Sequence, residues 1–239
     1  MVMENKQRQL TRQTLLIDAD DTLWENNIYF ERAIAAFIAF LDHRTLTPTE
    51  VRAVFDEVEH ENTKKHGYGT ASFERGLVAC FERLSHTPLT EAHCHRMHTF
   101  AASVREHPIE VLGSVAEALP LLAERHELIL VTKGNAAEQT QKLEQSGLAP
   151  YFDAVEVLHE KHCAAYQDIC DRRALGAPHT WMIGNSPKSD VNPALAVGLN
   201  AVYIHHPDTW VLEHAEIDAP QAGQQLLRLN AFGELLKWF

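Results

Sequence analysis

Short apolar runs that stop abruptly at small or polar residues recur along the chain and alternate with segments of helical pattern. The runs cover residues 15–17, 128–131, 155–158, 181–183 and 201–204. Each has the length of a buried strand, and such strands alternating with helices predict a parallel sheet covered by helices on both faces. Ligands of such sheets bind at the carboxyl ends of the strands. Asp18, Thr132 and Asn185 each follow a predicted strand, so we expect a site there.

The interval between the first two predicted strands, residues 25–107, has a helical pattern throughout. Four stripes of apolar residues recur there at helical spacing, and Thr47 and Thr90 stand at positions typical of N-terminal caps. Thr47 is followed by a proline and then by a glutamate three residues on, as in a capping box. We therefore expect an α-helical cap domain over residues 25–107, inserted into a Rossmann-like α/β core formed by residues 1–24 and 108–239. A cap at this point would form a lid over the strand ends.

Charge and composition exclude several classes of partner. Of the 239 residues, 33 are acidic and 21 are lysine or arginine, which gives a formal net charge of −12. Such a chain is poorly suited to binding nucleic acid or an anionic membrane, and no apolar run approaches the roughly 20 residues of a membrane span. The four cysteines have no CxxC spacing, so we expect reduced thiols in a cytoplasmic protein. The sequence does not indicate an oligomeric state.

Three carboxylates follow the first predicted strand within four positions: Asp18, Asp20 and Asp21. Carboxylates this close repel one another, and each resists burial. A divalent cation would offset the repulsion, and two aspartates at alternate positions just after a strand can point toward one site. A free carboxylate can attack an electrophile, and a second one whose pKa lies near neutrality can donate and then remove a proton.

Four short motifs occur in a fixed order, each at the end of a predicted strand or the start of a helix. They are DADDTL at residues 18–23, LILVTKG with Thr132, EKHCAAY with Lys161 and Tyr166, and MIGNSPKSD with Gly184, Asn185 and Asp190. In these motifs and their order the chain resembles the haloacid dehalogenase-like (HAD) hydrolase superfamily, in its phosphatase type with an α-helical cap. One such motif alone would be weak, whereas four in order are specific.

The resemblance implies a role for each principal motif residue. Asp18 would be the nucleophile that forms an aspartyl-phosphate, and Asp20 would protonate the leaving oxygen and then activate the hydrolytic water. Thr132 would hydrogen-bond the phosphoryl group, and Lys161 would neutralise its charge and hold Asp18 in place. Phosphoryl transfer depends mostly on positioning and on neutralising oxygen charge, and this set provides both.

The resemblance also implies one Mg²⁺, held by the carboxylates of Asp18 and Asp190 and by the backbone carbonyl of Asp20. Asp190 could in addition cap a helix that starts at the next residue. Two positions depart from the family's pattern: Asp21 stands where glycine is frequent, and Asn185 stands where the fourth motif usually has aspartate. An amide oxygen can accept a hydrogen bond from a metal-bound water but brings no charge, so Asn185 should weaken the metal site without removing it.

Other residues near the motifs have less specific interpretations. Lys133 and Gly134 follow Thr132 and are candidates for substrate contact. Lys188 lies in the fourth motif, and for both lysines a surface position is an equally good interpretation. Trp24 begins the predicted cap, where packing at a hinge is a better interpretation than contact with substrate.

The motifs together predict Mg²⁺-dependent hydrolysis of a small phosphorylated metabolite through an aspartyl-phosphate. One alternative is a 2-haloacid dehalogenase, which shares the fold and the aspartate nucleophile but needs neither a metal nor a second acid. The presence of Asp20 argues against it, because a halide leaving group needs no proton. A second alternative is a catalytically weak binding or regulatory protein, which Asn185 makes conceivable.

Overall fold

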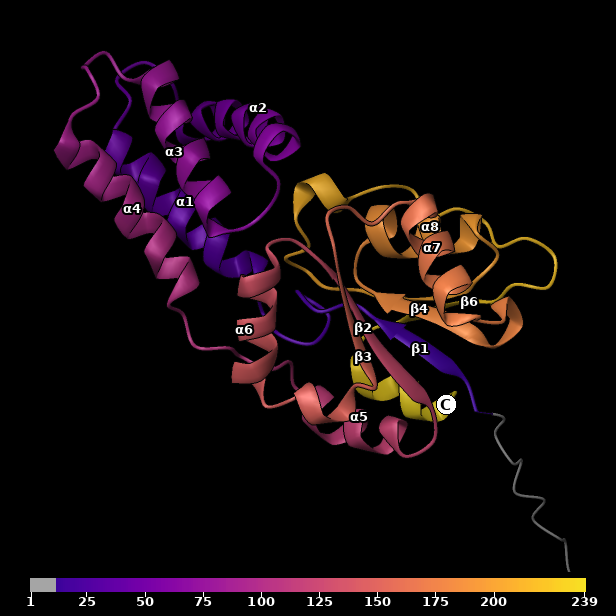
Figure 1. Cartoon of the computed structure of the whole chain (residues 1–239). Coiled ribbons are helices and arrows are strands. Elements are labelled where there is room, and N and C mark those ends of the chain that lie inside the picture. The colour runs from indigo at the N-terminus through magenta and orange to yellow at the C-terminus, as the bar shows by residue number, and fades with distance from the viewer. Residues whose placement is uncertain (1–11) are drawn as a thin grey trace, which may run out of the picture.

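A six-stranded sheet forms the centre of the protein, with the strand order β3-β2-β1-β4-β5-β6 (Figure 1). The computed structural model describes residues 12–239. Every neighbouring pair of strands is parallel. The strands are β1 (Thr14–Ile17), β2 (Glu127–Lys133), β3 (Ala154–Leu158), β4 (Thr180–Gly184), β5 (Asn200–Ile204) and β6 (Leu226–Leu229). Because β1 lies between β2 and β4, Asp18 emerges at the middle of the carboxyl edge of the sheet.

The five predicted strands and the parallel α/β fold are confirmed, with two differences. Thr132 lies inside β2, which continues to Lys133 because it pairs with β3 up to Leu158, so the expectation that Thr132 follows the strand was wrong. The edge strand β6 was not predicted. Its sequence, Leu-Leu-Arg-Leu, is short and only its last residue is buried, so it lacks the continuous apolar pattern of the inner strands.

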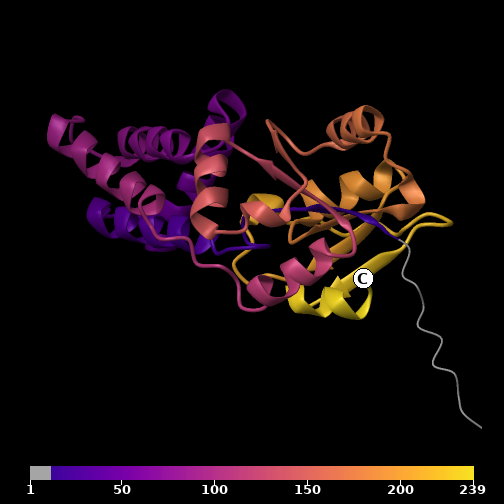
Figure 2. The ribbon, with the colours of Figure 1, turned by 60° about the horizontal axis from the view of Figure 1, so that its bottom comes forward.

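Helices cover both faces of the sheet, as Figure 2 shows. Successive residues of a strand point to opposite faces. Leu15 and Ile17 therefore pack against α5 and the C-terminal turn, and Leu16 packs against α7 and α8. The core helices are α5 (Val115–Ala123), α6 (Ala136–Ser146), α7 (Cys163–Arg173) and α8 (Asn192–Ala196). Shorter turns are η1 (Ala149–Tyr151), η2 (Ala177–His179), η3 (Pro187–Val191), η4 (Val211–Glu213) and η5 (Phe232–Lys237).

Four helices between β1 and α5 form a separate bundle, which we call the helical insert. They are α1 (Asn27–Leu41), α2 (Pro48–His66), α3 (Thr70–Leu84) and α4 (Glu91–Arg105). The insert has its own apolar cluster, around the fully buried Phe37, Phe55 and Leu77. Capping boxes begin α2 at Thr47 and α4 at Thr90. The helices of this interval are therefore confirmed, whereas domain limits at residues 25 and 107 stay a prediction.

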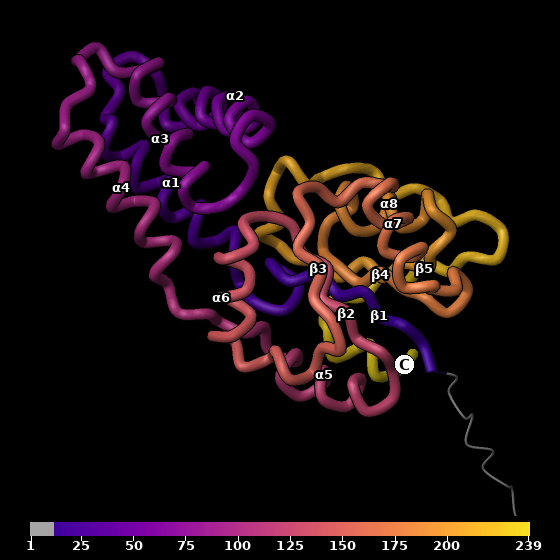
Figure 3. Tube along the Cα trace, in the orientation of Figure 1, coloured from indigo at the N-terminus to yellow at the C-terminus, as the bar shows by residue number. Residues whose placement is uncertain are grey.

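Two chain segments connect the insert to the core and run side by side (Figure 3). The backbone N–H of Glu25 donates to the carbonyl of Glu110 at 2.9 Å, and that of Leu112 donates to Leu23 at 2.9 Å. The insert thus meets the core over a narrow connection beside the carboxyl edge of the sheet. Within residues 12–239, no helix has both the length and the apolar character needed to cross a membrane.

Candidate active site

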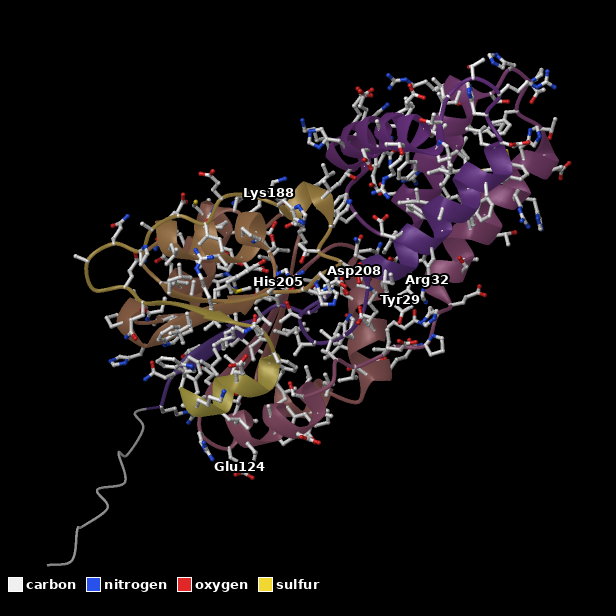
Figure 4. All side chains as sticks on the ribbon, turned by 180° about the vertical axis from the view of Figure 1, so that it is seen from behind. Tyr29, Arg32, Glu124, Lys188, His205 and Asp208 are labelled. Carbon is white, nitrogen blue, oxygen red and sulfur yellow. The ribbon has the colours of Figure 1, made fainter. Side chains whose placement is uncertain are left out.

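A cavity of about 180 Å³ lies between the carboxyl edge of the sheet and the helical insert. The structure brings all the predicted site residues to this cavity: Asp18, Asp20, Thr132, Lys133, Gly134, Lys161 and Asp190, with Asn185 beside them. Lys188 is exposed instead, and its ammonium donates to the carbonyl of Leu212 at 2.8 Å, so the surface interpretation holds for it. Figure 4 labels Tyr29 and Asp208 at the junction where the insert meets the core.

Lys161 links the two aspartates at the deepest point of the site. Its ammonium donates to Asp18 Oδ1 and, at 2.7 Å, to Asp190 Oδ1. All three side chains are buried. Burial lowers the pKa of Lys161, but the charges of Asp18 and Asp190 outweigh that effect and hold the pKa above its usual value. The lysine therefore stays charged, and a surface position for it is excluded.

Asp190 is fixed by the loop that follows β4. Its Oδ2 accepts from the backbone N–H of Ser186 at 3.0 Å. Asp190 lies inside the turn η3, and Ser186 caps that turn, so the expected capping role of Asp190 was wrong. A Cβ atom on Gly184 would lie 2.1 Å from Asp190 Oδ2, which explains why a glycine ends β4. Burial and the charge of Asp18 raise the pKa of Asp190 to about 7.

Asp20 is held by three donors from other parts of the chain. Trp24 Nε1 donates to its Oδ1 at 2.8 Å, Lys142 Nζ to the same oxygen at 2.9 Å, and Gln139 Nε2 to Oδ2 at 2.7 Å. Burial raises the pKa of Asp20, but the Lys142 charge and these hydrogen bonds bring it below its usual value. The expectation of a carboxyl with a pKa near neutrality was therefore wrong for the protein without substrate.

Trp24, Gln139 and Lys142 are positioning residues that the sequence did not reveal. Trp24 is fully buried, so its packing interpretation holds, and its indole in addition orients Asp20. Gln139 and Lys142 stand one turn apart on α6. The i, i+3 spacing of two polar residues on a helix that follows a strand-end motif is the signal that could have indicated them.

Asp21 adopts a backbone φ of 60°, in the left-handed region that favours glycine. Aspartate is one of the few other residues that tolerate this region. Its Oδ1 accepts from the backbone N–H groups of Asn26 at 2.8 Å and Asn27 at 3.0 Å, where α1 begins. Burial raises its pKa to about 8. An aspartate in place of the family's glycine thus caps the first helix of the insert.

Asn185 connects the first motif to a loop of the core. Its Oδ1 accepts from the hydroxyl of Thr22 at 3.3 Å, and its Nδ2 donates to Thr209 Oγ1 at 3.0 Å. The same Thr22 hydroxyl donates to Asp18 Oδ2 at 2.8 Å. The amide oxygen of Asn185 therefore faces Thr22 of the first motif, and its N–H group is taken up by Thr209.

Lys133 is already neutralised by a carboxylate. Its ammonium donates to Glu213 Oε1 at 2.5 Å and to Ser189 Oγ at 2.9 Å, and it lies 4.6 Å from the ring centroid of Tyr68. Gly134, with a φ of 132°, adopts a conformation that side chains rarely allow, so the chain can turn from β2 toward α6. Thr132 is almost fully buried at the cavity wall.

The loop before α3 joins the insert to the core. Tyr68 donates its hydroxyl proton to Glu160 Oε2 at 2.5 Å, and Thr70 Oγ1 donates to Glu138 Oε1 at 2.8 Å. Both carboxylates belong to the core, next to the second and third motifs. The insert is thereby held over the strand ends by hydrogen bonds as well as by the two connecting segments.

The deepest part of the site has the donors that a magnesium ion prefers. Asp18 and Asp190 are two buried carboxylates that share one ammonium, so one cationic side chain faces two anionic ones. Carboxylate and carbonyl oxygens are hard ligands that suit Mg²⁺. These residues therefore fit the cation that the sequence predicted.

A second group of three potential ligands lies at the edge of the cavity. The ligand atoms of Asp21, Glu25 and His206 lie within 4.8 Å of one another. Their arrangement has a sufficient explanation without a cation, because Asp21 caps α1 and His206 Nε2 lies 3.3 Å from Glu25 Oε2. The sequence gave no indication of this group.

Comparison with known proteins gives the class of the chain. A family model for haloacid dehalogenase-like hydrolases matches residues 13–198. The chain is 22% identical over 201 residues to the HAD-hydrolase YfnB of Bacillus subtilis (strain 168), covering 82% of this chain and 84% of YfnB. Its structure is similar to a haloacid dehalogenase-like family hydrolase from Xanthomonas campestris, with a TM-score of 0.76 and 28% identity over 94% of this chain and 92% of the other. L-2-haloacid dehalogenase from Xanthobacter autotrophicus shares the fold, with a TM-score of 0.63 and 14% identity over 95% and 98% of the two chains.

The chain belongs to the haloacid dehalogenase-like hydrolase family, because the family match covers most of its length and includes all four motifs. The resemblance inferred from those motifs is confirmed at the level of the superfamily. Haloacid dehalogenases are among the proteins that share the fold. Family membership therefore defines a hydrolase, and the substrate has to be argued from the site.

Proposed function

We propose that the protein is a Mg²⁺-dependent phosphatase that hydrolyses a small phosphate monoester through an aspartyl-phosphate on Asp18. The observation that carries the proposal is the second carboxylate. Asp20 lines the same cavity as Asp18, Lys161 and Asp190, and three donors fix its side chain. A group held this firmly beside a nucleophile suits proton transfer to a leaving oxygen, which an ester of phosphate requires.

In the first step, an oxygen of the Asp18 carboxylate attacks the phosphorus atom, and the bond from phosphorus to the leaving oxygen breaks. The leaving oxygen takes a proton from Asp20, which leaves Asp20 ionised. Lys161 offsets the charge of the phosphoryl oxygens and holds Asp18 in place, and the Thr132 hydroxyl hydrogen-bonds the phosphoryl group. Neutralisation and positioning of this kind supply most of the catalysis of phosphoryl transfer.

In the second step, Asp20 removes a proton from a water molecule, whose oxygen attacks the phosphorus atom of the aspartyl-phosphate. The bond from phosphorus to Asp18 breaks, inorganic phosphate leaves, and both aspartates return to their starting states. In the free protein, burial raises the pKa of Asp20, but the charge of Lys142 and the hydrogen bonds to the carboxylate lower it below its usual value. A bound phosphate dianion repels the Asp20 carboxylate and so raises that pKa, which makes a proton available for the first step.

The carboxylates of Asp18 and Asp190 and the backbone carbonyl of Asp20 would hold Mg²⁺, which would stabilise negative charge on the phosphoryl oxygens. Asn185 would contribute an uncharged oxygen to the surrounding hydrogen bonds. A structure of YfnB, a protein of the same fold, is described as bound to magnesium. This supports the assignment, together with the two buried carboxylates that share one lysine.

A 2-haloacid dehalogenase is the second candidate function. Asp18 would then displace a halide from carbon, and water would hydrolyse the resulting ester. Two observations favour it: 2-haloacid dehalogenases share the fold, and Lys142 keeps the pKa of Asp20 low in the free protein. Dehalogenation does not use Asp20 as an acid, because a halide leaves without a proton, so we place this function second.

One paired assay separates the candidates. The purified protein is incubated with p-nitrophenyl phosphate or with 2-chloropropionate, each with Mg²⁺ and with excess EDTA, and inorganic phosphate and chloride are measured. We expect phosphate release with Mg²⁺ only, and no chloride. Chloride release that persists in EDTA would establish the dehalogenase, and the absence of both products would favour a binding or regulatory protein.

A further inference from the structure

The helical insert provides one wall of the cavity, and this wall combines apolar and polar side chains. Phe30 and Ile34 of α1 and Phe73 of α3 line it. Glu59 of α2 lines the same wall and is the only charged residue of α2 or α3, within residues 12–239, to do so. A buried charge on an apolar wall is unfavourable unless it has a partner.

Glu59 lacks such a partner at one of its oxygens. The residue is 9% exposed, and its Oε2 is buried without a hydrogen-bond partner among the described residues. Burial raises its pKa to about 7, against the opposing charge of Arg52. A carboxyl placed only for packing or stability would be satisfied, because an unsatisfied buried acceptor destabilises the fold. The open oxygen indicates that a ligand completes it.

The neighbouring polar group also offers an acceptor. Asn62, one turn after Glu59 on α2, uses its Nδ2 to donate to the carbonyl and the hydroxyl of Ser72, at 2.6 and 2.9 Å. A carbonyl can only accept, so this bond fixes the orientation of the amide. Asn62 therefore has its Oδ1 left for the cavity that it lines. Two acceptors one turn apart on the same helix match a group that donates hydrogen bonds.

The charges around the cavity also favour a substrate group that donates hydrogen bonds. Eight carboxylates and four lysine or arginine side chains line it. Each of the three lysines already contacts a carboxylate, and the arginine, Arg105, pairs with Glu106. A second anionic group on the substrate would therefore meet repulsion, whereas a neutral or cationic donor would not.

We propose that Glu59 binds an N–H group at the far end of the leaving group, so that the substrate is a phosphate monoester with an apolar body and a terminal amine or amide. The inference rests on the proposed phosphatase function. The phosphoryl group would lie at Asp18 and Lys161, the apolar body against Phe30 and Phe73, and the nitrogen at Glu59. The insert would thus select the substrate and the core would cleave it.

The test uses four phosphate esters of matched chain length, each also prepared with shorter alkyl spacers: 6-aminohexyl phosphate, 6-phosphooxyhexanamide, heptyl phosphate and 6-phosphooxyhexanoate. We expect kcat/KM for the amine or the amide to exceed that for heptyl phosphate by about 10- to 100-fold, as for a hydrogen bond to a charged group. The carboxylate should be the poorest substrate. The amine and amide arms distinguish a cationic from a neutral donor.

Glu59→Gln keeps the size of the side chain and removes its charge. We expect it to abolish the preference for the amine, to leave hydrolysis of heptyl phosphate within about threefold, and to raise Tm, because an unsatisfied buried charge is lost. Glu61→Gln, two residues on along α2 and exposed, is the matched control and should change neither.

Three results would overturn the inference while leaving the phosphatase intact. They are equal rates on all four esters in the wild type, a preference for the carboxylate, and a Glu59→Gln variant that loses Tm and slows on every ester alike. The last would show that Glu59 only braces the insert. Failure of the wild type to release phosphate from any ester with Mg²⁺ would overturn the proposed function itself, and the inference with it.

Discussion

The two ends of the cavity are built differently. At the core end, the polar side chains of Asp18, Asp20 and Asp190 have a donor on every carboxylate oxygen. At the insert end, apolar side chains such as Phe30 and Phe73 line part of the wall, and Glu59 has an oxygen without a partner among the described residues. The carboxylates of the three aspartates are therefore hydrogen-bonded without a ligand, whereas the carboxylate of Glu59 is only partly so.

This difference separates chemistry from recognition. A reacting centre has to be preorganised, because its groups must hold their geometry before the substrate arrives. A recognition surface can leave acceptors open, because the ligand satisfies them and an analogue without the matching donor leaves them unpaired. Changes at the core end should therefore reduce turnover on every substrate, and changes at the insert end should alter stability and substrate preference.

The largest effect is expected from Asp18→Asn. An amide cannot form the aspartyl-phosphate, so kcat should fall by about 10⁴-fold or more on every phosphate ester. The fold should persist, because Lys161 keeps its contact with Asp190 at 2.7 Å and one of two repelling charges is removed. Initial rates and Tm of the purified variant measure both, with Asp168→Asn on the exposed face of α7 as a control. Substantial activity in Asp18→Asn would refute the assignment of the nucleophile.

A smaller effect is expected on the pH dependence of stability at the insert end. The pKa of Glu59 is raised to about 7 in the folded protein, so the folded state holds more protons than the unfolded state from about pH 4.5 to 7. The free energy of unfolding therefore falls as the pH rises through this range. Arg52, Asp56 and Glu31 are the charged neighbours that act on Glu59, and none of them removes the shift.

Glu59→Gln should abolish that fall. The variant should be more stable than the wild type by about 3 kcal/mol above pH 7 and about equally stable below pH 4.5. Urea unfolding at a series of pH values measures the difference, with Glu61→Gln as the control. A variant that is less stable than the wild type at pH 8 would mean that the folded protein stabilises the ionised carboxylate of Glu59, which would contradict the raised pKa.

Asn185→Asp tests whether charge or hydrogen bonding at position 185 matters more for Mg²⁺ binding. The substitution adds a negative charge near the predicted Mg²⁺ and should tighten its binding about tenfold, equivalent to about 1.4 kcal/mol. It also replaces the Nδ2 donor to Thr209 Oγ1, which limits the gain. Titration of Mg²⁺ against initial rate at fixed ionic strength measures the midpoint, with Asn230→Asp as a distant control. A higher Mg²⁺ concentration at half-maximal rate in the variant would show that the hydrogen bond to Thr209 matters more than the added charge.

Tyr68→Phe should have the smallest effect. It removes the hydroxyl that donates to Glu160 Oε2 and so loosens one contact between insert and core. A lost hydrogen bond of this kind costs about 1 kcal/mol, so KM should rise severalfold while kcat stays nearly unchanged. Tyr151→Phe, in η1 and outside the residues that line the cavity, is the matched control. A fall in kcat with an unchanged KM would place Tyr68 in the chemistry instead.

The core end could largely be predicted from the sequence. Asp18, Lys161 and Asp190 are spread over more than 170 positions, yet each follows a strand, and a parallel sheet brings the ends of its strands together. The strand-end motifs therefore indicated the cluster without any knowledge of the packing. The pKa of Asp20 could not be foreseen, because it depends on Lys142 of α6, and the sequence does not show where α6 packs.

The insert end could not be predicted, because a helix has many positions and only packing decides which of them is buried. Glu57, Glu59 and Glu61 lie on the same helix, and only Glu59 is buried. One signal was present: Val51, Phe55 and Glu59 follow one another at intervals of four, so a carboxylate continues an apolar stripe. A polar residue in such a stripe is a reason to expect a ligand or a buried network.

The central claim is that Asp18 is phosphorylated during turnover, and acid quenching of the working enzyme tests it most directly. The wild type is mixed with Mg²⁺ and a phosphate ester labelled in its phosphoryl group, stopped in acid within a few turnovers, digested, and the labelled peptide is sequenced. The account predicts label on Asp18, none in Asp18→Asn, and loss of the label when a chase of unlabelled ester is given. Steady release of inorganic phosphate with no label on Asp18 at any time would contradict it.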